Sequence, residues 1–280
     1  MMPRAPLPFD FFSKCLTWAL VLAALAVTLF PIYWGFTVSI KSSADAFASP
    51  PLWSFSPVWD HYAKLWDKEI FRDSFFNSAV ITTVAVTLSL ILSIPAAYAL
   101  CRMRPRGAKL IAMWLLLAYM LPEFLFIIPM YGLYQAVNLY DTHFGMALVY
   151  QAHALPFSIW MLRSFFNEVP RALDEAAALE GCGHWQILRQ VYLPASLPGV
   201  AAVAVLNAIW IWNELAIALG LTFADAQTVT VGVTSFRGYT NIDWGAMSAA
   251  SIAALLPMLL LSFLVQRHIV KGLTLGAVKG

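Results

Sequence analysis

The chain has 280 residues, of which 61% are hydrophobic and 11% are charged, and its mean hydropathy is +0.73. A typical soluble domain carries about 25% charged residues, and a soluble globule of this size could not bury so much apolar surface. The composition therefore excludes a soluble protein and predicts a polytopic membrane protein. The net charge of +2 is uninformative as a total, and the three cysteines, which are far apart in the sequence, predict neither a disulfide framework nor a zinc site.

Charge-poor stretches predict six transmembrane helices. The first, at 15–40, contains no charge between Lys14 and Lys41 and is long enough to cross about 30 Å of hydrocarbon. It is too long for the core of a signal peptide, so we expect a retained anchor. The other five are expected at 74–101, 110–136, 144–162, 199–221 and 245–265.

The segments between these helices give the expected organisation of the chain. It comprises a cytoplasmic N-terminus at 1–14, the first helix at 15–40, an extracytoplasmic loop at 41–73, a core of five helices at 74–266 that includes a polar loop at 163–197, and a cytoplasmic tail at 267–280. Cytoplasmic loops of membrane proteins are enriched in Lys and Arg. With both termini inside, the cytoplasmic segments carry twelve of the 17 basic residues and the outer segments five, which predicts that the polar loop is cytoplasmic.

The polar loop, called the elbow below, has the signals of two short helices joined at a glycine. Pro170 fits the first turn of a helix, and Asp174 and Glu175 then lie near its positive N-terminal end. Gly181 ends that helix, and a second helix can begin at His184. Such an elbow has little core of its own, so it is expected to be a surface that a partner protein grips.

The elbow resembles a known motif. Its residues Glu175-Ala176-Ala177, Gly181, Leu193-Pro194 and Pro198 resemble the EAA loop of permease subunits from bacterial ABC importers, in which the loop forms coupling helices that dock into a groove on a cytoplasmic ATPase. Cys182 is a departure, because the family more often has Ala there, but Cys is small and apolar and we expect no change of role. The resemblance implies an ATPase-coupling role for Glu175, Ala176, Ala177, Leu179, Gly181 and His184. The alternative is an ordinary cytoplasmic loop with a capped helix.

The resemblance extends over residues 71–266, which look like the core shared by these permeases. The ending Gly272-Leu273-Thr274, followed by Ala277, Val278, Lys279 and Gly280, resembles that of carbohydrate-importer permeases similar to the smaller permease of the maltose transporter. In that branch the tail reaches the ATPase dimer, which implies an ATPase contact for Ala277, Val278, Lys279 and Gly280. The loop 222–244 matches in position one that reaches into the open mouth of the sugar-binding protein.

The resemblance therefore implies an all-α integral membrane protein with six transmembrane helices, the type I ABC importer permease fold and cytoplasmic coupling helices. It implies a multi-pass protein of the bacterial inner membrane that imports sugar by alternating access. The implied partners are a second homologous permease, two ATPase subunits, an extracytoplasmic solute-binding protein and membrane lipid, with no nucleic acid.

The sequence lacks the common motifs for nucleotide binding and for catalysis. It has no GxxxxGK[ST] phosphate loop, no HExxH and no GxSxG, and its five histidines share no ligand spacing. We therefore expect no enzymatic activity, cofactor or metal, with ATP hydrolysis supplied by a partner. The alternatives are an ABC importer for a non-sugar solute and an ion-coupled secondary transporter, which usually shows an internal repeat that is not evident here.

Polar residues inside predicted helices suggest a translocation path. A carboxylate in lipid costs at least a few kcal/mol, so Glu123 and Glu214 should face the bundle interior, a cavity or an interface. Asn207, Trp210 and Glu214 are spaced by three and four residues and fall on nearby helix faces, with Asn213 beside them. This stripe fits two alternatives equally well: it could line a sugar path, or it could form hydrogen bonds between permease subunits.

Three further hypotheses concern single features. Glu175 is expected to pair with an arginine of the ATPase, the alternative being a solvated carboxylate that only complements the helix dipole. Gly181 is expected to need a backbone conformation that a Cβ disfavours. The basic cluster 102–109 is predicted to anchor the chain at lipid headgroups rather than to bind a ligand.

Overall fold

The structure is a computed structural model that describes residues 8–237 and 242–277, with side chains described for 13–237 and 242–263. Within these residues the chain forms helices and turns, and the only β-type contact is an isolated bridge between Arg237 and Ile242. The chain divides into two compact units, the first made of Met1–Asp67 and Phe236–Ala253 and the second of Lys68–Ser235 and Ala254–Gly280. The predicted all-α fold is confirmed.

The first unit contains the N-terminal helix α1 (Pro8–Ser39) and two short helices, α2 (Ser43–Ala46) and α3 (Asp60–Leu65). Every side chain described from 13 to 33 in α1 is exposed, as expected of an apolar helix that lies in lipid or against another chain. Lys41, just after α1, is buried, donates through Nζ to the Leu52 carbonyl at 2.8 Å, and lies over the ring of Trp34.

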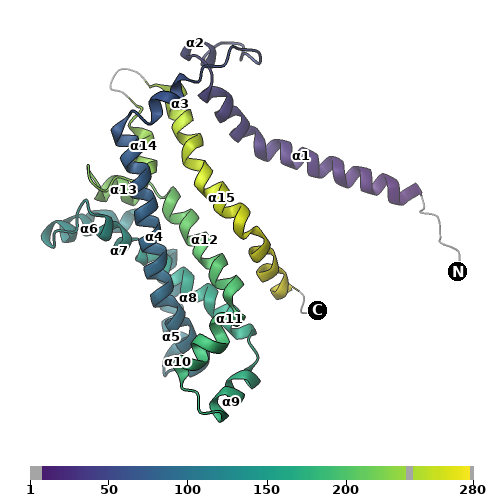
Figure 1. Ribbon diagram of the computed structural model, residues 1–280, viewed down its shortest axis with the longest axis vertical. Helices are drawn as coiled ribbons and strands as arrows, with labels where there is room; N and C mark the ends of the chain where they lie inside the picture. The colour runs from purple at the N-terminus through teal and green to yellow at the C-terminus, as the bar shows by residue number, and fades with distance from the viewer. Residues whose placement is uncertain (1–7, 238–241, 278–280) are drawn as a thin grey trace. The chain divides into compact units, whose positions relative to one another are not determined.

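The second unit is a bundle built around α4 (Glu69–Tyr98), which continues as the π-helix η1 (Ala99–Met103). Helices α7 (His143–Val149), α8 (Gln151–Glu168), α12 (Leu197–Asn213) and α14 (Val229–Thr234) pack on α4, and α5 (Ala108–Met120) packs on α8. Figure 1 shows α9 and α10 at one end of this bundle and α13 and α14 at the other.

A buried stripe of small polar residues explains how closely the helices approach α4. Ser74, Ser78, Thr82, Ser89 and Ser93 recur at helical spacing and are all buried. Small side chains let membrane helices pack closely, and their hydroxyls can bond across helices. The Ser89 hydroxyl is 2.9 Å from that of Ser158 on α8, which also accepts a hydrogen bond of 2.6 Å from Asn207 on α12. The three central helices are thus tied together at mid-bundle.

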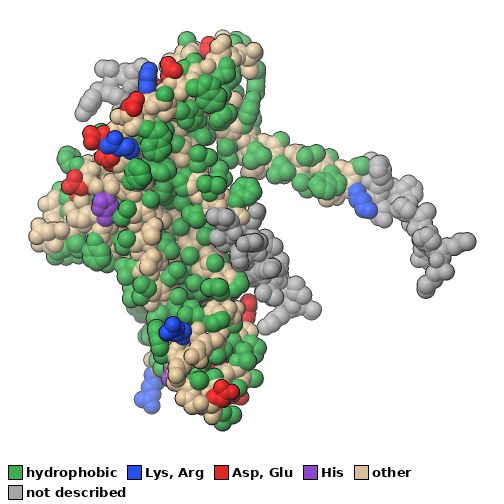
Figure 2. Space-filling view, viewed as in Figure 1, with side chains coloured by type: hydrophobic (Ala, Val, Ile, Leu, Met, Phe, Trp, Pro, Cys, Tyr) green, Lys and Arg blue, Asp and Glu red, His purple; other side chains and the backbone are tan. Residues whose placement is uncertain are grey.

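Among the described residues, three helices are long and apolar enough to cross a membrane: Ser13–Ser39, Glu69–Met103 and Trp244–Phe263. Two further pairs qualify only when each bent pair is taken as one span: Ala108–Met120 with Phe124–Ala136, and His184–Ala195 with Leu197–Asn213. The predicted fourth span, 144–162, is not among these candidates. Figure 2 shows hydrophobic side chains over the middle of the second unit and charged ones toward its ends.

The predicted third span is sharply bent. Helices α5 and α6 (Phe124–Ala136) meet at an angle of 94°. Leu121 precedes Pro122 and has extended backbone angles (φ −68°, ψ 133°), as a residue before proline prefers, and this ends α5. The predicted fifth span is likewise divided into α12 and α13 (Ala216–Leu221).

The last helix, α15 (Trp244–Ala277), has no break among its residues, so it includes most of the segment expected to be a separate tail. Val278, Lys279 and Gly280, for which an ATPase contact was expected, lie outside the described residues, and of Ala277 only its place at the end of α15 is described.

Candidate functional site

The elbow folds as its sequence predicts. Helix α9 (Arg171–Leu179) begins after Pro170, and Gly181 follows it with a φ of +85°. The second helix, α10 (His184–Ile187), begins after Gly183, whose backbone N–H donates to Gln186 Oε1 at 2.8 Å. The chain then returns to the bundle through the π-helix η2 (Leu188–Tyr192) and α11 (Leu193–Ala195), and the turn into α12 is bent by 78°.

The exposed surface of the elbow combines large apolar side chains with charged ones, including Glu175, Glu180 and Arg189. Leu179 is 91% exposed and Trp185 is 66% exposed, although both are large hydrophobic residues. Glu175 lies on α9 with its side chain exposed. Large apolar side chains exposed to this degree are typical of an interaction surface.

The six predicted coupling residues do not all face outward. Glu175, Ala176, Leu179 and Gly181 are exposed, whereas Ala177 packs against the buried cluster beneath the elbow. His184 is exposed, and its Nδ1 lies 3.4 Å from the hydroxyl of Tyr98 at the end of α4. Ala177 and His184 therefore contact the bundle and help to hold the elbow against it.

A single arginine joins the elbow to the ends of two long helices. Arg102, in η1, is only 9% exposed in its side chain, and its Nη2 donates to the carbonyls of Phe166 (3.1 Å) and Val169 at the end of α8. Its Nε lies 3.4 Å from Asp174 Oδ2 on α9, and its guanidinium lies 4.9 Å from the ring centre of Tyr192 on η2. These five residues are called the Arg102 joint below.

The basic cluster 102–109 was predicted to anchor the chain at lipid headgroups, and the Arg102 joint shows that this prediction is wrong for Arg102. Arg102 is not at a headgroup position, because its side chain is buried and directed to protein groups. Arg104, two residues later, is exposed. Nothing in the sequence separates the two arginines, because the partners of Arg102 are at least 64 residues away.

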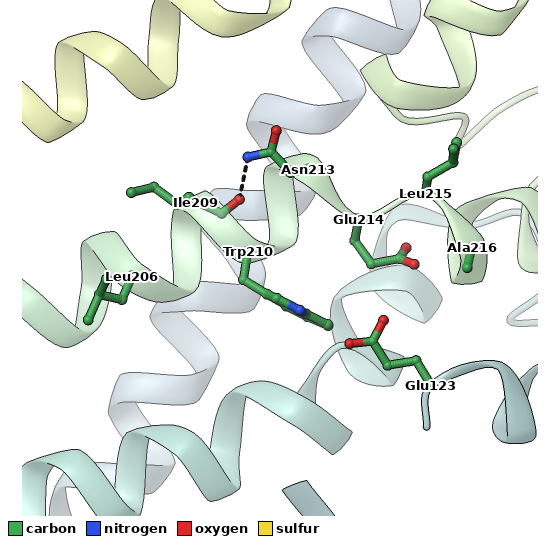
Figure 3. Close-up of a pocket in the computed structure, with 8 residues that line it drawn as sticks. All are labelled: Glu123, Leu206, Ile209, Trp210, Asn213, Glu214, Leu215 and Ala216. Atoms are coloured by element: carbon green, nitrogen blue, oxygen red, sulfur yellow. Dashed lines mark hydrogen bonds between the residues drawn. The ribbon is translucent and has the colours of Figure 1, made fainter. Parts of the chain in front are cut away.

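A cavity of about 460 Å³ contains four of the five predicted path residues. Glu123, Trp210, Asn213 and Glu214 line it together with apolar side chains. Figure 3 shows the carboxylates of Glu123 and Glu214 pointing toward one another, with the Trp210 ring beside them. Asn207 is not among the lining residues; it is 1% exposed and bonds to Ser158.

The two carboxylates of this cavity differ in their surroundings. Glu214 is 6% exposed and accepts the N–H groups of Ile217 (2.7 Å) and Ala218 (3.1 Å), so it caps α13 at the helix break. It also accepts the Tyr150 hydroxyl at 3.1 Å. Glu123 is more open, at 34% side-chain exposure, with one carboxylate oxygen 3.6 Å from His153 Nδ1. Glu123 is therefore the carboxylate that a ligand could reach.

Aromatic stacking fixes the cavity wall. The ring of His153 lies parallel to that of Trp210, with centroids 3.8 Å apart and an interplanar angle of 7°. Tyr119 and Tyr150 pack against the same pair, at 4.5 Å from His153 and 5.7 Å from Trp210. Sequence reasoning missed His153, whose only signal was its place inside a predicted apolar span.

Comparison with known proteins identifies the family. Residues 89–275 match the model of the binding-protein-dependent transport system inner membrane component. The chain belongs to this family of permeases. Curated relatives include a probable ABC transporter permease of Sinorhizobium fredii, 36% identical over 95% of this chain and 96% of its own length.

Two other relatives carry names of carbohydrate systems. The diacetylchitobiose uptake system permease of Streptomyces coelicolor is 34% identical to this permease over 90% of the chain and 92% of its own length. The trehalose transport system permease of Mycobacterium tuberculosis is 33% identical over 94% of the chain and 97% of its own length.

The fold is shared with a solved importer. A chain of a bacterial ABC transporter for the acidic polysaccharide alginate has a TM-score of 0.75 to this permease at 22% identity, and covers 95% of this chain and 99% of its own. The predicted importer-permease fold is therefore confirmed.

A third feature of the permease, at the end of the bundle opposite the elbow, was not predicted. Both oxygens of the Asp141 carboxylate accept backbone N–H groups of residues 223–226, in four bonds of 2.9 to 3.0 Å. Asn77 holds the same segment by donating to the carbonyls of Asp225 and Gln227. Burial by itself raises the pKa of Asp141, but the four amides outweigh it and hold that pKa below its usual value.

We expect Asp141→Asn to loosen residues 223–226, because an amide accepts on one atom where the carboxylate accepts on two. A hydrogen bond to a charged group contributes about 1.5–3 kcal/mol. Because Asp141 is partly exposed to water, we expect the substitution to lower the free energy of local opening by a total on the order of 1–2 kcal/mol. Hydrogen exchange of this segment measures it. Asp225→Asn is the control, since it removes a carboxylate that holds none of these bonds; equal exchange in both variants contradicts the prediction.

The same contact predicts a pH dependence. Because the folded pKa of Asp141 is lowered, its contribution is present above the unfolded pKa, about 3.9, and is lost as pH falls through the folded value. Exchange of residues 223–226, corrected for the intrinsic rate, should therefore accelerate only at acidic pH in the wild type and be independent of this titration in Asp141→Asn.

Proposed function

We propose that the permease is a transmembrane subunit of an ATP-driven, binding-protein-dependent sugar importer. Relatives named for diacetylchitobiose and trehalose systems, at 34% and 33% identity over nearly the whole chain, support a saccharide as solute. The distribution of basic residues supports a cytoplasmic location for both termini and the elbow. The inner-membrane assembly would contain a second homologous permease, two ATPase subunits and an extracytoplasmic solute-binding protein.

The exposed elbow, rigidly tied to the bundle, is the observation that carries this proposal. An ATPase surface can bury Leu179 and Trp185 on the outside of the elbow. Arg102 binds the inner side of α9 to the ends of α4 and α8. Displacement of the elbow on nucleotide binding would therefore move these helices as rigid bodies, which is the basis of alternating access.

The lined cavity is proposed as part of the solute path. Trp210 offers an aromatic surface and Glu123 an accessible acceptor, and saccharides bind through such surfaces with hydrogen bonds. Asn213 and Glu214 complete the polar lining, while Asn207 would act by holding α12 to α8. At the other end of the chain, Ala277, Val278, Lys279 and Gly280 are proposed to contact the ATPase subunits.

Reconstitution with the partner subunits tests the function. In proteoliposomes, ATP hydrolysis should rise with solute-loaded binding protein for one or more members of an oligosaccharide panel, and uptake should require ATP. Stimulation only by a non-sugar solute would move the assignment to another importer class. Uptake by the isolated permease on an ion gradient would instead indicate a secondary transporter.

Glu175→Ala tests the docking of the elbow. A carboxylate paired and buried against a partner arginine is expected to cost about 3–5 kcal/mol when lost, which is at least a hundredfold weaker ATPase docking. A carboxylate that only complements the helix dipole contributes about 0.3–1 kcal/mol, or less than roughly sixfold. Solute-stimulated ATPase activity distinguishes the two, with exposed Glu180→Ala on the same elbow as control.

A further inference from the structure

A second cavity, of about 500 Å³, lies where the turn after α4, the start of α5 and the end of α8 meet. We propose that it binds the headgroup of an anionic phospholipid. Three basic side chains line it, Arg104 from the turn, Lys109 from α5 and Arg163 from α8, and no acidic residue does. This cavity is called the basic cavity below. Its assignment is independent of the solute that the permease transports.

The positive charge of the basic cavity is not neutralised within the described part of the chain. None of the three basic residues has an ion-pair partner there. The carboxylates of Asp174 and Glu175 line an adjacent cleft of about 160 Å³, which shares Arg104 with the basic cavity, and Asp174 is paired there with Arg102. No carboxylate lines the basic cavity itself, so an anion that enters it contacts the three basic side chains directly.

Two further donors favour a phosphate group. The 13-residue helix α5 begins at the cavity with Ala108, whose own N–H donates to the Pro105 carbonyl at 3.0 Å; the other first-turn amides and the macrodipole of a helix N-terminus attract anions. Asn167 also lines the cavity, and its Oδ1 is already used by the Cys101 thiol at 3.0 Å. Its amide nitrogen can therefore donate to a ligand oxygen.

An apolar stripe beside the cavity indicates that the anion belongs to a lipid. Leu110, Trp114 and Leu117 follow one another at intervals of four and three along α5, which places them on one face. All are exposed, from 48% to 64%. A headgroup in the basic cavity would continue into acyl chains along this stripe.

The place of the cavity gives the lipid a structural consequence. Cys101 lines both the basic cavity and the cleft beside Arg102, and its thiol contacts Asn167 close to the carbonyls that Arg102 binds. A bound headgroup would contact Cys101 and Asn167, next to the Arg102 joint, and would restrict the movement of the joint. Elbow movement would then depend on the anionic lipid content of the membrane.

Lipid binding by the purified full-length chain tests the proposal directly. Native mass spectrometry in detergent would compare dioleoyl phosphatidylglycerol with dioleoyl phosphatidylcholine in the wild type, in Arg104→Gln/Arg163→Gln and in Arg106→Gln/Arg189→Gln. The second double variant is matched in charge, because Arg106 and Arg189 are exposed arginines that do not line the cavity. Each lipid-facing basic residue changes affinity by roughly fivefold, so the cavity variant should bind phosphatidylglycerol about 30-fold more weakly.

The possible results distinguish a lipid headgroup from a soluble anion as the ligand of the basic cavity. Selective loss in the cavity variant, with phosphatidylcholine bound weakly by all three proteins, supports the proposal. Equal binding by the two double variants overturns it, as does phosphatidylcholine binding as tight as that of phosphatidylglycerol. Displacement of the lipid by millimolar glycerol phosphate would show a soluble-anion site and also overturn it. Circular dichroism and elution volume establish that the cavity variant is folded.

Discussion

Gly181→Val is expected to abolish solute-stimulated ATPase activity of the assembled importer. Gly181 has a φ of +85°, which is accessible to glycine and costly for a β-branched residue. A Cβ built at this position meets nothing within 4 Å. The expected loss therefore comes from the backbone alone: valine would have to leave this conformation, at about 1–3 kcal/mol, and would redirect α10 relative to α9.

Gly183 supplies a matched control two residues away. Its φ of −75° suits any residue, and an added Cβ would lie 3.8 Å from Gln186 Oε1, an ordinary contact. Gly183→Val should therefore retain most of the activity. At position 181 the activity should follow Gly, Asn, Ala and Val in falling order, because Asn tolerates the left-handed region better than Ala does. An active Gly181→Val, or similar losses at 181 and 183, would contradict the prediction.

The elbow was predictable because its signals are local. Pro170 at the start of α9 and Gly181 at its end act within their own turns, and both act as expected. The helix-breaking effect of Pro122 is also local, but the 94° angle that results between α5 and α6 is set by packing on other helices and was not predicted.

The contacts that hold the elbow and the segment 223–226 in place were not predictable from one sequence. Arg102 binds Phe166 across 64 residues, and Asp141 binds Phe223 across 82. Both residues have types that are common at the polar ends of membrane helices, so nothing in their neighbourhood reveals a distant partner. Glu123 and Glu214 were expected to avoid lipid, but only the fold brings them to one cavity.

Arg102→Met is expected to destabilise the elbow and to uncouple ATP hydrolysis from transport. The substitution leaves the carbonyls of Phe166 and Val169 without their donor and Asp174 without its cation. Removing one partner of a buried ion pair costs about 3–5 kcal/mol. The 23% exposure of the Asp174 side chain puts the expected value near 3 kcal/mol, because water partly solvates the remaining charge. Arg104→Met, which removes an exposed arginine two residues away, should change stability far less.

A double-mutant cycle separates the ion pair from the other contacts of Arg102. In Arg102→Met/Asp174→Asn no unpaired carboxylate remains, so the double variant should be more stable than the sum of the single variants predicts, by about 1–2 kcal/mol. The ratio of solute moved to ATP hydrolysed is the second readout. If the Arg102 joint transmits movement, Arg102→Met should lower this ratio, because the proposed ATPase contact on the outer surface of α9 would remain while α4 and α8 would no longer follow it. Equal falls in hydrolysis and transport, with an unchanged ratio, would show that Arg102 only stabilises the fold.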